Sequence, residues 1–145
     1  MVLRLSLDVH AFRSVREVIG YVDKILQNLE KKAQILEKLY NDTKARAERL
    51  MKLEKYFSEI LGGDVSSIRE IDLMGLKVIV DSRPVDELKV YDEVLSSIRD
   101  RIDALRKVRK VIEPLANTLD QGENIQILLE TMNGIPIRLL IKMPE

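Results

Sequence analysis

The feature that most constrains this chain is an unbroken 3–4 spacing of apolar residues from about residue 11 to 61. The seam starts at Phe12 and Val15 and reaches Leu61 without a skip. Such a sustained spacing predicts one long helix of coiled-coil type. A second apolar row widens the stripe, so we expect this helix to pack against more than one neighbour. This row consists of Val18, Ile25, Leu39, Leu53 and Ile60.

The segment YNDTK at residues 40–44 is the one place where the long helix could break. Asn and Asp favour helix caps and turns, so Asn41-Asp42 offers a start or stop signal. The apolar seam nevertheless stays in register across it, which favours a continuous helix. Gly62-Gly63 then provides the expected end, because glycine suits the residue that follows a helix.

A second helix is predicted over residues 84–119. Ser82 is a candidate N-cap and Pro84 suits the first turn, whereas Asp86 and Glu87 favour the positive end of the helix dipole. An apolar seam runs from Leu88 to Ile112. Pro114 is expected to kink or end this helix, and the LDQG segment at residues 119–122 to close it.

The two ends of the chain carry β-type patterns. Residues 2–9 alternate, with Leu3, Leu5, Leu7 and Val9 on one face, which predicts a half-buried strand. Residues 124–142 hold two β-rich runs around the dipeptide Asn133-Gly134, which is typical of a type I′ hairpin turn. Pro136 implies that its strand has at least one unpaired flank.

A third β-type segment lies between the helices, in a tip region at residues 64–82. The run LKVIVD reads as a strand. Residues 66–73 allow either a short helix capped by Ser67 and Glu70 or a second strand. Because the other predicted strands belong to the far end of the helices, this segment must pair with its neighbour or with another chain. It is therefore the best single candidate for an assembly contact.

These elements predict an α+β fold that is predominantly α, in one domain over residues 1–145. The expected architecture is a long antiparallel coiled-coil helical hairpin, with a short β element at its tip. A small antiparallel sheet, made of the N-terminal strand and the C-terminal hairpin, is expected at the other end.

Folding the helices back through the connection at residues 62–84 pairs residue i with about 146 − i. This pairing leaves residues 11–28 of the first helix to project beyond the second, with the sheet packed on them. Two seam positions are polar. Arg109 is expected near Leu36 and Glu37, and Glu54 near Tyr91. Each could fix register or partner choice, or could extend to water along its aliphatic stem.

Residue types exclude several kinds of site. The chain has no cysteine, which excludes disulfides, thiolate metal sites and cysteine nucleophiles. Its single histidine, His10, excludes a multi-histidine metal site within one chain, and we expect this residue to be exposed or to cap a helix. No spacing matches a metal loop or a phosphate loop. We therefore expect no catalytic, metal or cofactor-binding site, and not an enzyme.

Charge and composition limit the partners and the cellular location that we expect for the protein. Lys and Arg number 24, as do Asp and Glu, so no overall field favours nucleic acid or membrane. High charge without Cys or Trp is typical of thermophile proteins. No apolar run approaches the roughly 20 residues that span a bilayer. Arg4 and Asp8 interrupt any signal-peptide core, so a cytoplasmic location is expected.

Basic residues concentrate on the helices. Residues 30–56 carry eight Lys or Arg against five Asp or Glu. Arg99, Arg106 and Lys110 share one face of the second helix, interrupted by Asp103. Such a face could follow phosphates, but no aromatic residues interleave as a platform for single strands requires. A solvated helix face is the favoured interpretation.

The order helix, short β-hairpin, helix resembles a β-type prefoldin subunit over residues 24–116. The segment IREIDLMGLKVIVDSRPVDELKVYDEVLSSIRDRIDALRKVRK looks like the hairpin of that family followed by its second coil. In that family the hairpins assemble into a central barrel, and the coil tips hold unfolded proteins for a chaperonin. The resemblance implies five assembly residues: Ile71, Leu73, Leu76, Val78 and Val80.

The sequence therefore supports three hypotheses about function. The leading one is a non-enzymatic, oligomeric scaffold or protein-interaction module, with a homo-oligomer (dimer or higher) as the expected state. The alternative is a prefoldin-like chaperone that holds unfolded proteins. The third is a nucleic-acid-associated protein that contacts phosphates through its basic helices.

Overall fold

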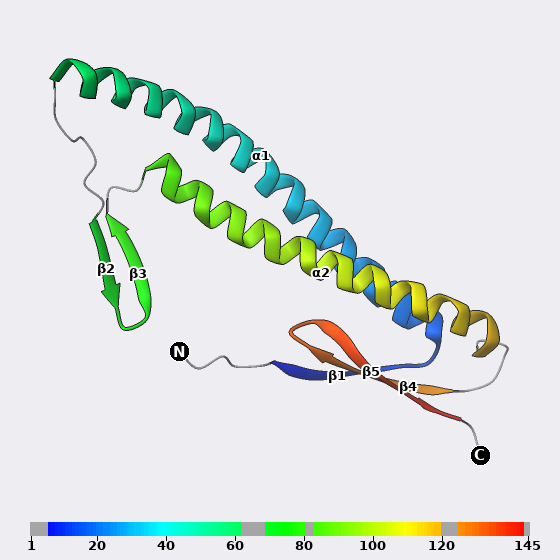
Figure 1. Ribbon diagram of the computed structural model, residues 1–145. Helices are drawn as coiled ribbons and strands as arrows, with labels where there is room; N and C mark the ends of the chain where they lie inside the picture. Colours follow the sequence, from blue (N-terminus) through cyan, green and yellow to red (C-terminus); the bar gives the residue numbers. More distant parts are fainter. Residues whose placement is uncertain (1–5, 62–68, 81–82, 120–124, 144–145) are drawn as a thin grey trace. The chain divides into compact units, whose positions relative to one another are not determined.

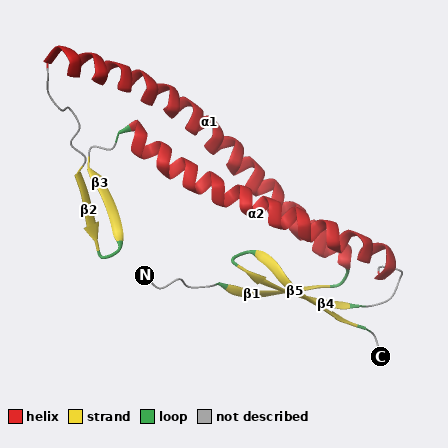
Figure 2. Cartoon of the chain, viewed as in Figure 1, coloured by secondary structure: helices red, strands yellow, loops and turns green. Residues whose placement is uncertain are grey.

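The computed structural model describes residues 6–61, 69–80, 83–119 and 125–143. The fold is α+β and predominantly α, with two long helices and five short strands in these ranges (Figures 1 and 2). In chain order the elements are β1 (Leu7–Phe12), α1 (Val15–Leu61), β2 (Arg69–Leu73), β3 (Leu76–Val80), α2 (Pro84–Leu119), β4 (Gln126–Met132) and β5 (Ile135–Lys142).

The chain divides into two compact units. One consists of Gln34–Ser96 and holds the β2–β3 hairpin, whereas the other consists of Val2–Ala33 and Ser97–Glu145 and holds the three-stranded sheet. Both helices pass from one unit into the other. The single domain expected from the sequence stays a prediction.

A capping box starts α1. The backbone N–H of Glu17 donates to Ser14 Oγ at 3.1 Å, and Glu17 Oε2 accepts from the backbone N–H of Arg13 at 2.9 Å. The first bond satisfies a donor that the helix start leaves without a partner, and the second holds the residue before the cap, one position earlier than in the usual capping box. The S-x-x-E spacing at Ser14 was visible in the sequence, but the predicted start at residue 11 overlooked it. The helix then runs without a break through Asn41-Asp42, as expected.

Local signals also set the start of α2. Pro84 occupies the first helical position, as expected from its fixed φ and its missing N–H. The carboxylate of Asp86 accepts from the backbone N–H of Arg83 at 2.9 Å. The predicted cap, Ser82, lies outside the described residues. Pro114 does not end the helix, which continues to Leu119.

The three-stranded sheet has the order β1-β4-β5, and both of its pairings are antiparallel. The predicted turn between β4 and β5 is confirmed, because Asn133 and Gly134 both have positive φ angles, 53° and 82°. Asn133 also forms two hydrogen bonds with Ser6, directly before β1. Its backbone N–H donates to the carbonyl of Ser6, and its side-chain Oδ1 accepts from the Ser6 N–H.

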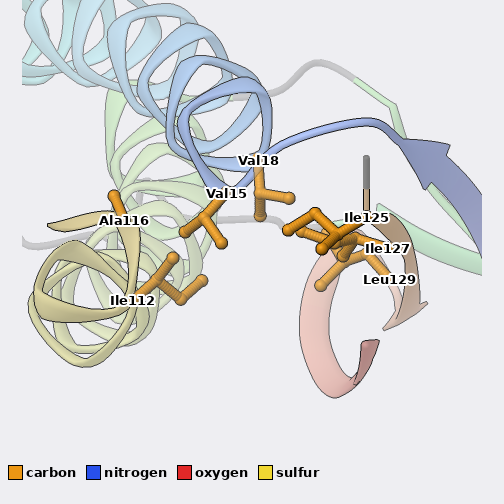
Figure 3. Packing of buried hydrophobic residues seen from close by; sticks show 7 residues of the cluster. All are labelled: Val15, Val18, Ile112, Ala116, Ile125, Ile127 and Leu129. Carbon is orange, nitrogen blue, oxygen red and sulfur yellow. The ribbon is translucent and has the colours of Figure 1, made fainter. Parts of the chain in front are cut away.

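The core of this unit lies between the sheet and the two helix ends (Figure 3). One face of β4 supplies the apolar floor, and both helices cover it. Because both helices pack on the same sheet, the sheet holds the start of α1 and the last turns of α2 in place. The buried members are Val15 and Val18 of α1, Ile112 and Ala116 of α2, and Ile125, Ile127 and Leu129 of the β4 segment.

The helix pairing expected from the sequence is wrong in this unit. Arg109 meets Asp23, and Arg106 meets Glu30, rather than partners near residues 37 and 40. The antiparallel direction holds, but the register differs by roughly three helical turns. The first helix therefore does not project alone over residues 11–28, because its first turns pack against Ile112 and Ala116.

The other unit shows the same shift and its cause. Glu54 forms an ion pair with Arg83, directly before α2, rather than lying near Tyr91. Arg46 pairs with Glu87 at 3.2 Å. The estimate from the sequence assumed that the helices end level with each other at their connection. Instead α1 continues about two turns past Glu54, to Leu61. Each residue of α2 therefore lies opposite an earlier residue of α1 than expected.

The predicted N-terminal strand also needs correction. β1 covers Leu7–Phe12 instead of residues 2–9, of which residues 2–5 lie outside the described part. Leu7 and Val9 are exposed, whereas His10 and Phe12 are half-buried and face the core side. Alternation identifies two faces of a strand, but it does not say which face the rest of the chain covers.

Candidate assembly surfaces

The outer face of the three-stranded sheet, away from the core, is apolar and exposed. The exposed fractions are 62% for Leu7, 61% for Val9, 43% for Leu128 and 54% for Leu140. These side chains line a shallow hollow of about 390 Å³, together with Asp8, Glu130 and Arg138. We call this surface the outer face. Apolar side chains gathered in this way are typical of contact sites, whereas single exposed ones need no explanation.

A pair of opposite charges lies in the outer face. Glu130 of β4 and Arg138 of β5 are direct cross-strand partners, and Arg138 Nε lies 3.6 Å from Glu130 Oε1. Val9 is the partner of Glu130 on its other side, in β1. The face therefore presents two adjacent opposite charges amid apolar neighbours, which is a self-complementary combination.

Sequence reasoning did not select the outer face. It placed Leu7 and Val9 on the buried side and gave Leu128 and Leu140 no role. A signal was present, because residues 127–129 of β4 are apolar without alternation. A strand that is apolar on both faces is expected to be covered on both.

The five assembly residues implied by the prefoldin resemblance lie in the β2–β3 hairpin. Its register sets Ile71 opposite Val78 and Leu73 opposite Leu76, with Val80 opposite Arg69. Directly opposed residues share a face of a hairpin, so all five positions fall on the same face. Residues 69–73, left open between helix and strand, form β2; residues 66–68 lie outside the described part.

The turn of this hairpin exposes apolar side chains. Met74 is fully exposed and has a φ of 53°, an uncommon conformation for a residue with a side chain. The backbone N–H of Gly75, with a φ of 92°, donates to Asp72 Oδ1 at 3.0 Å. Leu76 follows and is also exposed. The end of the hairpin thus offers two apolar side chains to the solvent.

Both polar seam residues form ion pairs with a distant part of the chain: Arg109 of α2 with Asp23 of α1, and Glu54 of α1 with the residue just before α2. Arg109 Nε donates to Asp23 Oδ1 at 2.6 Å, and its Nη1 lies 3.3 Å from Glu113 Oε2. The hydrogen bond to Asp23, followed by the charge of that carboxylate, raises the pKa of Arg109. Glu54 pairs with Arg83. The roles of Arg109 and Glu54 in register stay predictions, now with named partners.

The candidate basic face on α2 carries its charges at the surface. Arg99, Arg106 and Lys110 are exposed, as is Asp103 between them. Arg106 Nη2 lies 3.2 Å from Glu30 Oε1 of α1, so an acidic group accompanies this cation. The geometry therefore adds no observation in favour of phosphate binding.

His10 forms a small polar cluster beside the core. Its Nε2 lies 3.2 Å from the hydroxyl of Tyr21 and 3.7 Å from Asp8 Oδ2, and the centroid of its ring lies 6.5 Å from that of Phe12, with the two rings tilted. The histidine is half-buried rather than exposed, and it lies within β1 while Ser14 caps α1, so neither the exposed position nor the capping role expected from the sequence applies. Burial, followed by the charge of Asp8, raises the pKa of Tyr21.

Metal sites and membrane-spanning helices are two further possibilities for such a chain. In the described ranges, no group of three or more His, Asp or Glu side chains is placed to hold a metal ion. Neither α1 nor α2, over the same residues, has an apolar stretch that could cross a membrane. The surfaces that distinguish this chain are the apolar ones described above. Compared with protein-family models, curated proteins and solved structures, the chain matches none of them.

Proposed function

We propose that this chain is a non-enzymatic, oligomeric scaffold or protein-interaction module, and that its copies associate through the outer face. The observation that carries the proposal is the exposed apolar set Leu7, Val9, Leu128 and Leu140 around the Glu130–Arg138 pair. Burying such a set releases about 25 cal/mol per Å² of apolar surface. Two-fold association brings Glu130 of each copy near the other copy's Arg138.

The size of the outer face sets the expected affinity of self-association. Strands of about six residues, three abreast, cover roughly 20 by 14 Å. This is well below the roughly 800 Å² that each partner contributes to a standard interface. We therefore expect association in the micromolar range from this face alone, and a tighter assembly where the hairpin turn at Met74 and Leu76 adds contacts.

Single-cysteine variants test the contact directly, because the natural chain has no cysteine. Leu128→Cys places a thiol beside the charge pair, and Lys24→Cys places a control thiol on an exposed part of α1. Mild oxidation is expected to link Leu128→Cys chains at least tenfold faster than Lys24→Cys chains. Equal rates for the two variants would contradict association through the outer face.

A second candidate function, holding of unfolded proteins as in the prefoldin resemblance, is favoured by the hairpin register that places five apolar positions on one face. It predicts that the protein suppresses aggregation of a denatured model protein at a near-stoichiometric ratio. The Leu76→Lys variant is expected to lose that effect if the hairpin assembles the holding complex. Aggregation that proceeds unchanged with an oligomer present would eliminate this candidate.

A further inference from the structure

A groove separates α2 from the edge strand β5 within the sheet-containing unit. Its volume is about 490 Å³, and its floor reaches Ile112 and Leu129 of the core. Val108, Val111 and Leu115 line it from the helix, and Ile137, Leu139 and Ile141 line it from the strand. Val111 is 71% exposed and Ile137 is 49% exposed, so the groove presents apolar surface that the described chain leaves uncovered.

The strand beside this groove is an open sheet edge. β5 pairs only with β4 among the described strands of its sheet. Its first residues are poor partners for another strand, because Pro136 has no N–H and the register shifts between Glu130 and Thr131, which leaves Ile137 as a bulge. Residues 138–142 follow this bulge, and along the groove they present regular backbone groups that no described strand pairs.

The charges around the groove have one sign. Of the residues that line it, the only charged ones are Lys107 and Arg138. Lys142, on the outer side of β5 by strand alternation, adds another cation, and β5 carries no acidic residue. Arg138 shares its charge with Glu130 on the outer face. A second copy of β5 is an unsuitable occupant, because self-pairing would bring cations together.

From the open edge, the apolar groove and the basic rim, we propose that β5 and α2 form a docking site for an extended segment of a partner protein with alternating apolar and acidic residues. The segment adds to β5 as a fourth strand. Its apolar side chains enter the groove against Val108 and Val111, and its acidic side chains lie on the opposite side, beside Arg138 and Lys142. This is strand addition with pockets for alternate side chains.

The site goes beyond the proposed self-association, since it requires one copy only and its groove lies on the opposite side of β5 from the outer face; the two surfaces share Arg138. The probe is a fluorescent eight-residue peptide of alternating valine and glutamate, measured by anisotropy. Measurements on the Val9→Lys variant separate the two ideas. This substitution alters the outer face at β1, and its lysine can pair with Glu130, the cross-strand partner of residue 9.

We expect the peptide to bind both the natural chain and Val9→Lys, with at least tenfold weaker binding to Val111→Gln. Val90→Gln, the same change at an exposed valine of α2 outside the groove, is expected to bind normally. Lys142→Gln is expected to bind more weakly and with a shallower dependence on salt concentration. An alternating valine–lysine peptide and a valine–glutamate peptide with every amide N-methylated are expected not to bind.

Three results would overturn the proposal. The first is absence of binding of the valine–glutamate peptide at millimolar concentration. The second is equal binding of the N-methylated peptide, which cannot form the backbone ladder. The third is loss of self-association on Val111→Gln, since the groove would then hold a second copy. Binding of the peptide by a protein that stays monomeric would refute the proposed self-association and leave the docking site intact.

Discussion

The guanidinium of Arg109 in α2 holds both carboxylate oxygens of Asp23 in α1, from Nε at 2.6 Å and from Nη2 at 3.5 Å. This two-point contact joins positions 86 residues apart in the chain. A two-point contact between a planar guanidinium and a carboxylate is geometrically specific. The pair therefore defines which turn of α1 lies beside which turn of α2 in the unit that contains the sheet.

Replacing Arg109 by lysine tests this specificity. Lysine keeps the charge but cannot make the two-point contact, so we expect Arg109→Lys to lower the thermal midpoint nearly as much as Arg109→Met. The exposed neighbour Lys110→Met serves as the control and is expected to change little. Circular dichroism melts in low salt and in 1 M NaCl should show that the loss shrinks with screening. Arg109→Lys melting like the natural chain would show that charge alone suffices.

Adjacent residues of β4 should differ sharply in their contribution to folding. Ile127 is fully buried in the core cluster, whereas Leu128 points to the outer face. Ile127→Ala is expected to lower the free energy of unfolding by about 2–5 kcal/mol. Leu128→Ala, measured by urea denaturation at a concentration where the chain is monomeric, is expected to stay within about 0.5 kcal/mol. Equal losses for the two variants would contradict the assignment of Ile127 to the core side of the sheet and of Leu128 to the outer face.

The capping box of α1 gives a third prediction. Ser14→Ala leaves the N–H of Glu17 without its partner, and we expect a loss of about 0.5–2 kcal/mol in the free energy of unfolding. Lys24→Ala, in the interior of the same helix and on its exposed side, is expected to have little effect. Urea denaturation measures both. A Ser14→Ala variant as stable as the Lys24→Ala control would remove the capping role.

The elements of this fold that could be predicted from the sequence are those set by neighbouring residues. Asn133-Gly134 adopts the positive φ angles of its turn, and Pro84 begins α2 at the expected position. The uninterrupted seam correctly favoured a continuous α1 across Asn41-Asp42. In each case the relevant physics, a preferred backbone angle or a helical periodicity, acts over a few residues and leaves a trace in the local sequence.

Predictions that depend on two distant segments were less successful. The register of α1 against α2 depends on how far α1 continues beyond Glu54, and the seam repeats too regularly to distinguish one register from the next. The covered face of β1 depends on which side of the sheet the helices occupy. For that reason the exposed Leu7 and Val9 were assigned to the core, and the outer face was overlooked.

Tyr21 gives the protein a predicted dependence on alkaline pH. Its pKa is raised, so above pH about 10 the unfolded chain ionises this tyrosine before the folded chain does. The folded state then binds more protons, and stability falls as pH rises further. Because Tyr21→Phe removes the hydrogen bond to His10, we expect its free energy of unfolding at pH 7 to be about 1 kcal/mol lower. Its free energy of unfolding is also expected to fall less steeply as the pH rises into the alkaline range. Parallel urea titrations at pH 7 to 11 measure both effects; an unchanged alkaline slope would contradict the assignment.

The central claim is that copies of this chain associate through the outer face, and light scattering of chromatographed protein over about 5–500 μM tests it most directly. A dimer with a dissociation constant in the micromolar range forms within these concentrations. We predict that the natural chain shifts from monomer to dimer or higher with concentration. Val9→Lys is predicted to stay monomeric with an unchanged circular dichroism spectrum. A natural chain that remains monomeric throughout, or a Val9→Lys variant that assembles equally well, would contradict the claim.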